Sequence, residues 1–320
     1  MVIEGLKIAG SSLGGFGVLS LAGLILGEVV ATCGPRIRQD QAACADALGL
    51  PYDNAAFTNE AGQVLRGWFF PAECSHAPCV LYAPGTSHDQ RSGLSLVAPM
   101  HAAGYSVLLF GYRGHGLSDG SRFGFTYGAN EQKDINAAVY YLYEQRGVEQ
   151  VGVIGFSAGA TAAILSAACN EKITAVVAAA PFASIEEAWE KSRPKVVPRV
   201  FYRLGLKFSE WRKGYLREQT CAACAIGDIA PRPVLLVEGT ADERIGAKQT
   251  RALLSAGHPP IGLWLVKGLT HRQLHSPGLS CLGDDLAAFF RRAFSHDLSS
   301  SAEDIFPGGP LRVLSLNTAT

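Results

Sequence analysis

Six short apolar runs, separated by stretches with a helical pattern, constrain the fold of this chain most strongly. A strand that is apolar along its whole length is buried on both faces. When such strands alternate with helices, they form a parallel sheet that is covered by helices on both sides. We therefore expect an α/β fold with a mostly parallel central sheet, preceded by a hairpin of residues 55–58 and 64–70. The runs are 79–83, 106–110, 151–154, 175–178, 234–237 and 262–266, and the helical patterns lie near 92–103, 130–146, 158–169, 244–256 and 283–294.

One connection is too long for a simple crossover between neighbouring strands. About 50 residues separate Pro181 from Pro231, whereas most such connections are far shorter. We expect an inserted helical cap over about 182–230. The part from Lys191 to Arg217 holds nine Lys or Arg residues and one acid, with five interleaved aromatic residues. This pattern is typical of a solvated helical cap, and it also fits a surface that faces anionic lipid or an acidic substrate.

The N-terminal segment reads differently from the rest. Residues 8–27 carry no charge, and about 20 apolar residues suffice to span a bilayer as a helix. The segment 1–32 is interpreted as an uncleaved single-pass membrane anchor, with an undetermined side. A signal peptide cleaved after 29–31, which would leave an exported soluble protein, and a buried helix are the alternatives. We expect 33–54 to be a linker, 55–296 the main domain and 297–320 a flexible tail.

Composition narrows the range of partners. Acidic and basic residues balance at 28 each, so no global charge favours nucleic acid. Eight cysteines are too few for a disulfide scaffold. The pairs Cys74 with Cys79 and Cys221 with Cys224 indicate buried thiols or one local disulfide, because a zinc site needs further ligands nearby. No cofactor motif occurs, so we expect none, and the oligomeric state is open.

The motif Gly-x-Ser-x-Gly occurs three times and only one copy has the right context. As a sharp turn between a strand and a helix, it lifts a serine hydroxyl above the edge of the sheet. Ser12 lies in the apolar N-terminal segment, and Ser118 lies several residues beyond its nearest strand. Ser157 directly follows the run 151–154 and directly precedes a helical pattern. Ser157 is therefore the predicted nucleophile.

A serine hydroxyl needs a base, and the base needs an orienting acid. With a nucleophile on such a turn, the acid and then the histidine follow it along the chain. The loop after run 234–237 contains Asp242, with Glu243 and Glu238 as alternatives. The loop after run 262–266 contains His271, with His275 as the alternative. Ser157, Asp242 and His271 are thus predicted as a catalytic triad.

The oxyanion that forms on attack needs preorganised donors. One is expected from the backbone N–H of Ala158, the residue after the nucleophile. The other is expected from the loop after run 79–83, where we assign the N–H of Thr86. Gly85 beside it lets the backbone approach closely.

Several ordered motifs together resemble the α/β-hydrolases. They are Ala83-Pro84-Gly85-Thr86, Gly104-Tyr105-Ser106-Val107-Leu108, Gly111-Tyr112-Arg113-Gly114-His115-Gly116-Leu117-Ser118 and Ile229-Ala230-Pro231-Arg232-Pro233. The chain is similar to the Bem46-like membrane-anchored group and to the serine aminopeptidase or monoglyceride-lipase-like group over residues 55–295. It departs from them at Pro84, where His is usual, and at Gly111, where many relatives have Asp. In this family the loop with Arg113 and His115 is structural.

The resemblance implies an α/β-hydrolase fold and a serine hydrolase. The expected activity is cleavage of a carboxylic ester, from a small acyl-ester or lipid-like substrate, through an acyl-enzyme. A peptidase or a thioesterase uses the same triad and differs in the acyl pocket. A catalytically silent binding module of the same fold is the alternative from another class.

Overall fold

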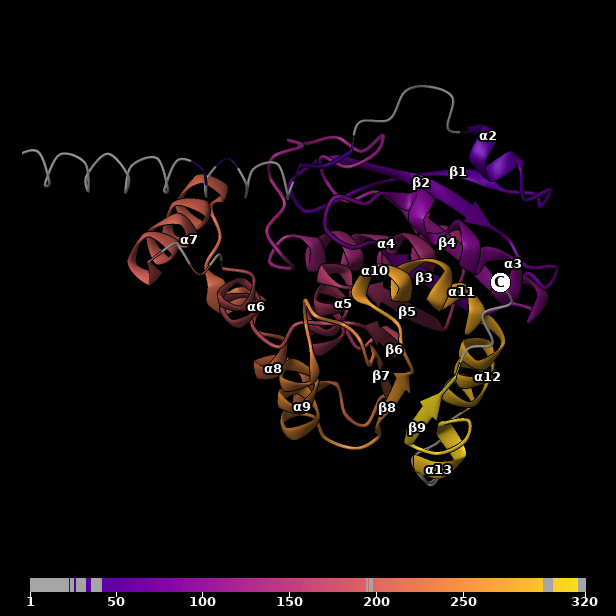
Figure 1. The fold of residues 1–320 in the computed structure, drawn as a ribbon. Coiled ribbons are helices and arrows are strands. Elements are labelled where there is room, and N and C mark those ends of the chain that lie inside the picture. The colour runs from indigo at the N-terminus through magenta and orange to yellow at the C-terminus, as the bar shows by residue number, and fades with distance from the viewer. Residues whose placement is uncertain are drawn as a thin grey trace, which may run out of the picture.

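The computed structural model describes residues 23, 26, 33–35, 42–193, 195, 198–295 and 302–315. Its centre is a nine-stranded sheet in the order β1-β2-β4-β3-β5-β6-β7-β8-β9 (Figure 1). β2 is antiparallel to both of its neighbours, β1 and β4, and all the remaining strand pairs are parallel. The strands are β1 (Asp53–Thr58), β2 (Val64–Phe70), β3 (Cys79–Ala83), β4 (Ser106–Phe110), β5 (Val151–Phe156), β6 (Ile173–Ala179), β7 (Val234–Gly239), β8 (Ile261–Val266) and β9 (Leu311–Leu314).

All six apolar runs and the hairpin form strands, so the predicted α/β architecture with a mostly parallel sheet is confirmed. The helices among the described residues are α2 (Ala42–Asp46), α3 (Leu94–Ala102), α4 (Glu131–Arg146), α5 (Ala158–Cys169), α6 (Ile185–Ser192), α7 (Arg199–Lys213), α8 (Ala222–Ala225), α9 (Ala247–Ala256), α10 (His271–Gln273), α11 (Leu279–Cys281), α12 (Gly283–Phe294) and α13 (Ala302–Ile305). Short helical turns are η2 (Gln90–Gly93), η3 (Arg217–Thr220), η4 (Ile226–Ile229) and η5 (Leu274–Gly278).

Two glycines of β5 show how helices cover both faces of the sheet. A Cβ atom on Gly152 would lie 2.3 Å from the ring of Phe290 on α12. A Cβ atom on Gly155 would lie 2.5 Å from the Cα of Ala160 on α5. Because side chains three positions apart point to opposite faces of a strand, α12 and α5 lie on opposite sides of β5. Both helices pack so closely against β5 that these two positions have no room for a side chain.

The C-terminal segment differs from the flexible tail that we expected over 297–320. Within it, β9 pairs in parallel with β8 and becomes the last strand of the sheet. Phe306 is fully buried and stacks on Phe289 of α12. Its ring occupies the space beside Gly262, where a Cβ would lie 2.7 Å away. These apolar contacts hold the segment on the domain, so the domain extends beyond residue 296.

The segments before β1 also differ in part from the predictions. The interpretation of 1–32 as an anchor or signal lies outside the described residues, apart from positions 23 and 26. Among the described residues, no helix combines the length and apolar character that a membrane span requires. In the expected linker, the N–H of Gly34 donates to the carbonyl of Arg122, and Ala45 of α2 is fully buried in the core. The described parts of 33–54 therefore pack on the domain.

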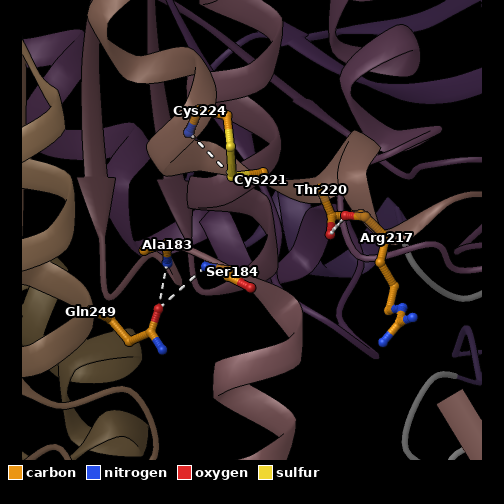
Figure 2. Close-up of a disulfide and its surroundings, with 7 residues drawn as sticks. All are labelled: Ala183, Ser184, Arg217, Thr220, Cys221, Cys224 and Gln249. Atoms are coloured by element: carbon orange, nitrogen blue, oxygen red, sulfur yellow. Dashed lines mark hydrogen bonds between the residues drawn. A yellow bond between two sulfur atoms is a disulfide. The ribbon is translucent and has the colours of Figure 1, made fainter. Parts of the chain in front are cut away.

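The connection between β6 and β7 consists of α6, α7, η3, α8 and η4, and α7 projects from the body of the molecule (Figure 1). The side chain of Gln249 on α9 fixes where this connection begins, since its Oε1 accepts from the N–H groups of Ala183 and Ser184 (Figure 2). A disulfide joins Cys221 and Cys224 where the connection returns. Of the two sequence pairs of cysteines, this one forms the local disulfide, and Cys74 and Cys79 are free thiols.

A buried ion pair between Arg113 and Asp134 gives the sequence motif of residues 111–118 a structural role. The carboxylate of Asp134 is fully buried and accepts from the Nε, Nη2 and backbone N–H of Arg113 and from Nδ2 of Asn59. Burial raises the pKa of Asp134, and the bonds from Arg113 and Asn59 partly offset that rise. His115 is also buried, with Nδ1 3.1 Å from the carbonyl of Arg113. Both residues therefore hold the loop together, as expected for this motif.

Arg113→Met is expected to destabilise the fold by about 3–5 kcal/mol, because it leaves the buried Asp134 without its counter-ion. Urea unfolding at neutral pH measures the loss. The loss of unfolding free energy should be smaller at mildly acidic pH. A raised pKa favours protonated Asp134 in the folded state, and protonation removes the uncompensated charge. Lys248→Met is the matched control: its pair with Glu187 is exposed on both sides and should contribute less than about 1 kcal/mol. Equal losses in the two variants would contradict this interpretation.

Candidate active site

Ser157 occupies the sharp turn between β5 and α5. Its φ of 53° and ψ of −120° are rare for a residue with a side chain. The turn is held by a 2.8 Å bond from the N–H of Ser157 to the carbonyl of Ala179. A Cβ atom on Gly159 would lie 2.2 Å from the carbonyl oxygen of Ala83. Only glycine therefore fits there, and the tight packing fixes the serine at the carboxyl edge of the sheet.

His271 and Asp242 come from the loops that follow β8 and β7. The two loops are joined by a 3.1 Å bond from the N–H of Ala241 to the carbonyl of Leu269. His271 Nε2 lies 3.1 Å from Ser157 Oγ, and its Nδ1 lies 2.7 Å from Asp242 Oδ2. The structure thus brings the three residues together in the order Ser157, His271, Asp242 that proton transfer requires.

The environment of Asp242 favours its charged form. The side chain is buried, which opposes ionisation. Hydrogen bonds from His271 and from the N–H groups of Ile245 and Arg244 outweigh burial, so the pKa of Asp242 is lowered. An ionised Asp242 favours the tautomer of His271 that carries its proton on Nδ1, with Nε2 facing Ser157 Oγ.

The alternative acids and the alternative base lie outside this arrangement. Glu238 is buried at the end of β7, and burial raises its pKa. Glu243 is exposed. His275 Nε2 lies 3.2 Å from the hydroxyl of Tyr82 rather than at the serine. Of the other two serine motifs, the one with Ser12 is outside the described residues. Ser118 donates to the carbonyl of Gly111 and accepts from the N–H of Arg66, which is a structural role.

The loop after β3 lies directly against the serine turn. A Cβ atom on Gly85 would lie 3.0 Å from the Phe156 ring and 3.5 Å from the Cβ of Ser157. His88 Nδ1 is 2.8 Å from the carbonyl oxygen of Thr86, so the ring holds the loop at that residue. Ala158 begins α5, and N–H groups in a first helical turn have no intrahelical partner. The assignment of Thr86 and Ala158 as oxyanion donors stays a prediction.

A second group of rings borders the triad and was not foreseen from the sequence. The ring of Phe156 lies 5.0 Å from that of His271 and 4.5 Å from that of His275. The His275 ring in turn lies 4.5 Å from the His88 ring. Burial, with His88 and His271 nearby, lowers the pKa of His275 to about 4. His275 is therefore neutral near pH 7 and links the loop of His271 to the loop of Thr86.

A further contact connects the acid loop to the segment between β6 and β7. Lys191 Nζ on α6 donates to the carbonyl of Ile245 at 3.1 Å, next to the N–H that binds Asp242. Among the described residues, no cluster of three or more His, Cys, Asp or Glu side chains has the geometry to hold a metal ion.

Sequence comparisons find a matching family model and several similar proteins. Residues 75–220 match the family model described as serine aminopeptidase, S33. The uncharacterized protein Rv2307c of Mycobacterium tuberculosis is 29% identical over 216 residues, which cover 66% of this chain and 69% of that protein. The polyketide transferase grgF of a Penicillium species is 28% identical over 148 residues, which cover 45% of this chain and 50% of that protein.

Solved structures share the fold. The esterase Pf2001 of Pyrococcus furiosus superposes with a TM-score of 0.63 at 21% identity, over 81% of this chain and 98% of that one. The α/β hydrolase GrgF of Penicillium superposes with a TM-score of 0.62 at 20% identity, over 77% of this chain and all of that one. With the sheet order and the strand-turn-helix at Ser157, these matches show that the chain has the α/β-hydrolase fold.

Proposed function

We propose that this chain is a serine hydrolase that cleaves carboxylic esters through an acyl-enzyme intermediate. The observation that carries the proposal is the continuous contact from Ser157 Oγ to His271 Nε2 at 3.1 Å and from His271 Nδ1 to Asp242 at 2.7 Å. Because a serine hydroxyl is a weak nucleophile without a base, we expect this contact to make the partly buried hydroxyl of Ser157 reactive. Its lowered pKa keeps Asp242 charged as the orienting acid.

The proposed reaction has two halves, formation of the acyl-enzyme and its hydrolysis. Ser157 Oγ attacks the ester carbonyl carbon while His271 Nε2 takes the hydroxyl proton. The tetrahedral oxyanion is stabilised by the N–H groups of Ala158 and Thr86. The C–O bond to the alcohol then breaks, and His271 donates its proton to the leaving oxygen. In the second half, water loses a proton to His271 and attacks the acyl carbon. The bond from the acyl carbon to Ser157 Oγ then breaks, His271 returns the proton to this oxygen, and the carboxylic acid is released.

Similar proteins, rather than the triad, are the basis for proposing esters over amides and thioesters as substrates. Pf2001, with the same fold, is described as an esterase, whereas the matching family model is described as an aminopeptidase. GrgF is described as a polyketide transferase, so an acyl acceptor other than water is compatible with the fold. The triad itself does not distinguish these acyl donors, because all of them pass through the same tetrahedral intermediate.

A substrate panel tests the proposal. Purified protein is assayed against p-nitrophenyl esters of increasing chain length, acyl thioesters and aminoacyl p-nitroanilides, with equal enzyme concentrations. We expect the highest kcat/KM for an ester. A higher value for the anilides would replace the esterase by a peptidase, and a higher value for the thioesters would replace it by a thioesterase. Lack of turnover in all three series by folded protein would favour a binding module.

A further inference from the structure

The outward face of α7 carries an apolar stripe. Val200, Leu204 and Trp211 follow one another at four and seven residues, which places them on one side of a helix. Their exposed fractions are 58%, 47% and 77%. Tyr202 and Leu206, on the opposite side, are buried toward the rest of the molecule. The described residues of the domain therefore leave the stripe largely uncovered.

Basic side chains lie within and beside this stripe. Arg203 and Lys207 lie on the same exposed side of α7, and no acidic group pairs with either of them among the described residues. Two further basic side chains, Arg199 and Arg217, are paired with Glu190 and Glu210. A hollow of about 630 Å³ runs between these four basic residues, with Val200 and Leu204 in its wall and Glu186 as its one acidic lining residue.

We propose that the outward face of α7 docks on an anionic lipid bilayer, with Trp211, Leu204 and Val200 entering the interface and Arg203 and Lys207 facing the headgroups. A helix with an apolar stripe and a basic border lies in the plane of a membrane surface. Lys and Arg side chains near an anionic leaflet strengthen such binding. An exposed tryptophan is also typical of the headgroup region, where its ring is partly apolar and its N–H stays hydrated.

An acidic protein partner is the other class of occupant with matching charge. The bilayer fits better because the apolar residues form a narrow line on a projecting helix, which suits shallow insertion. None of these side chains belongs to the proposed active site. The docking surface therefore stands or falls independently of the proposed ester hydrolysis.

Tryptophan fluorescence tests the docking surface on the full chain. Of the four tryptophans, Trp68 and Trp264 are buried and Trp189 is partly buried, so Trp211 is the most exposed. The protein is mixed with vesicles of phosphatidylcholine and phosphatidylglycerol whose acyl chains carry bromine, which quenches tryptophan on contact. The quenching that Trp211→Phe removes reports Trp211 alone. This readout is independent of whether another part of the chain also binds the vesicles.

We expect at least half of the Trp211 emission to be quenched on the anionic vesicles, and markedly less on vesicles of phosphatidylcholine alone. Arg203→Glu with Lys207→Glu should abolish this quenching. The matched control, Arg291→Glu with Arg292→Glu, reverses two exposed charges on α12 and should leave it unchanged. Circular dichroism verifies that each variant is folded. Equal emission with and without brominated lipid, or equal loss in both double variants, would overturn the proposal.

Discussion

Ser157→Ala is expected to lower kcat for the best ester on the order of 10⁴-fold to 10⁶-fold, because it removes the hydroxyl that lies 3.1 Å from His271 Nε2. The fold should persist. The N–H of Ser157, rather than its hydroxyl, holds the turn through the carbonyl of Ala179. Initial rates with purified protein measure the loss, and thermal unfolding checks that the variant is folded.

Ser118→Ala is the matched control, since Ser118 lies in the same sequence motif. Its hydroxyl bridges Gly111 and Arg66, so its removal should cost about 1 kcal/mol of stability. Turnover per folded molecule should be unchanged. Substantial hydrolysis by purified Ser157→Ala, or loss of turnover in folded Ser118→Ala, would contradict the assignment of the nucleophile.

Asp242→Asn is expected to lower kcat on the order of 10⁴-fold with little change in stability. The amide can still receive the N–H groups of Arg244 and Ile245 but no longer stabilises the imidazolium of His271. It also allows the tautomer of His271 whose Nε2 carries the proton and cannot accept one from Ser157. Because the pKa of Asp242 is lowered, the wild-type carboxylate stays ionised throughout the neutral pH range, and the loss in Asp242→Asn should persist across that range.

The two histidines of the same loop separate the base from its neighbour. His271→Ala should match the loss in Ser157→Ala, since the three residues act as a unit. His275→Gln should retain most of the turnover, because its ring contacts Tyr82 and His88 rather than the serine. If His275→Gln is inactive and His271→Ala is active, the base is His275 and the proposed triad is wrong.

The sequence predicts the parallel part of the sheet well because each strand is apolar along its whole length. It misses β9, whose residues Leu311 and Val313 are exposed. A four-residue strand with such a pattern resembles a solvated tail. It is held by Phe306, which fills the space beside Gly262 on β8. That contact joins residues 44 positions apart, and no local pattern indicates it.

Part of the candidate site could likewise be predicted from the sequence, and part could not. Ser157, Asp242 and His271 could be assigned because each follows its own strand, and parallel strands bring their carboxyl ends to one edge of the sheet. The ring contacts of His88 with His275 and the contact of Lys191 with Ile245 could not. They depend on how loops from separate strands and the segment between β6 and β7 meet in space.

Covalent labelling of the nucleophile tests the central claim most directly. A fluorophosphonate reacts with a serine only where a neighbouring base activates it, so the site of the adduct identifies the reactive residue. Full-length protein is treated with the probe, and mass spectrometry of the intact chain and of its peptides locates the label. The account predicts one phosphonyl group per chain, on Ser157, with no label in Ser157→Ala and slow labelling in His271→Ala. An unlabelled folded protein, or a label on a different serine, would contradict it.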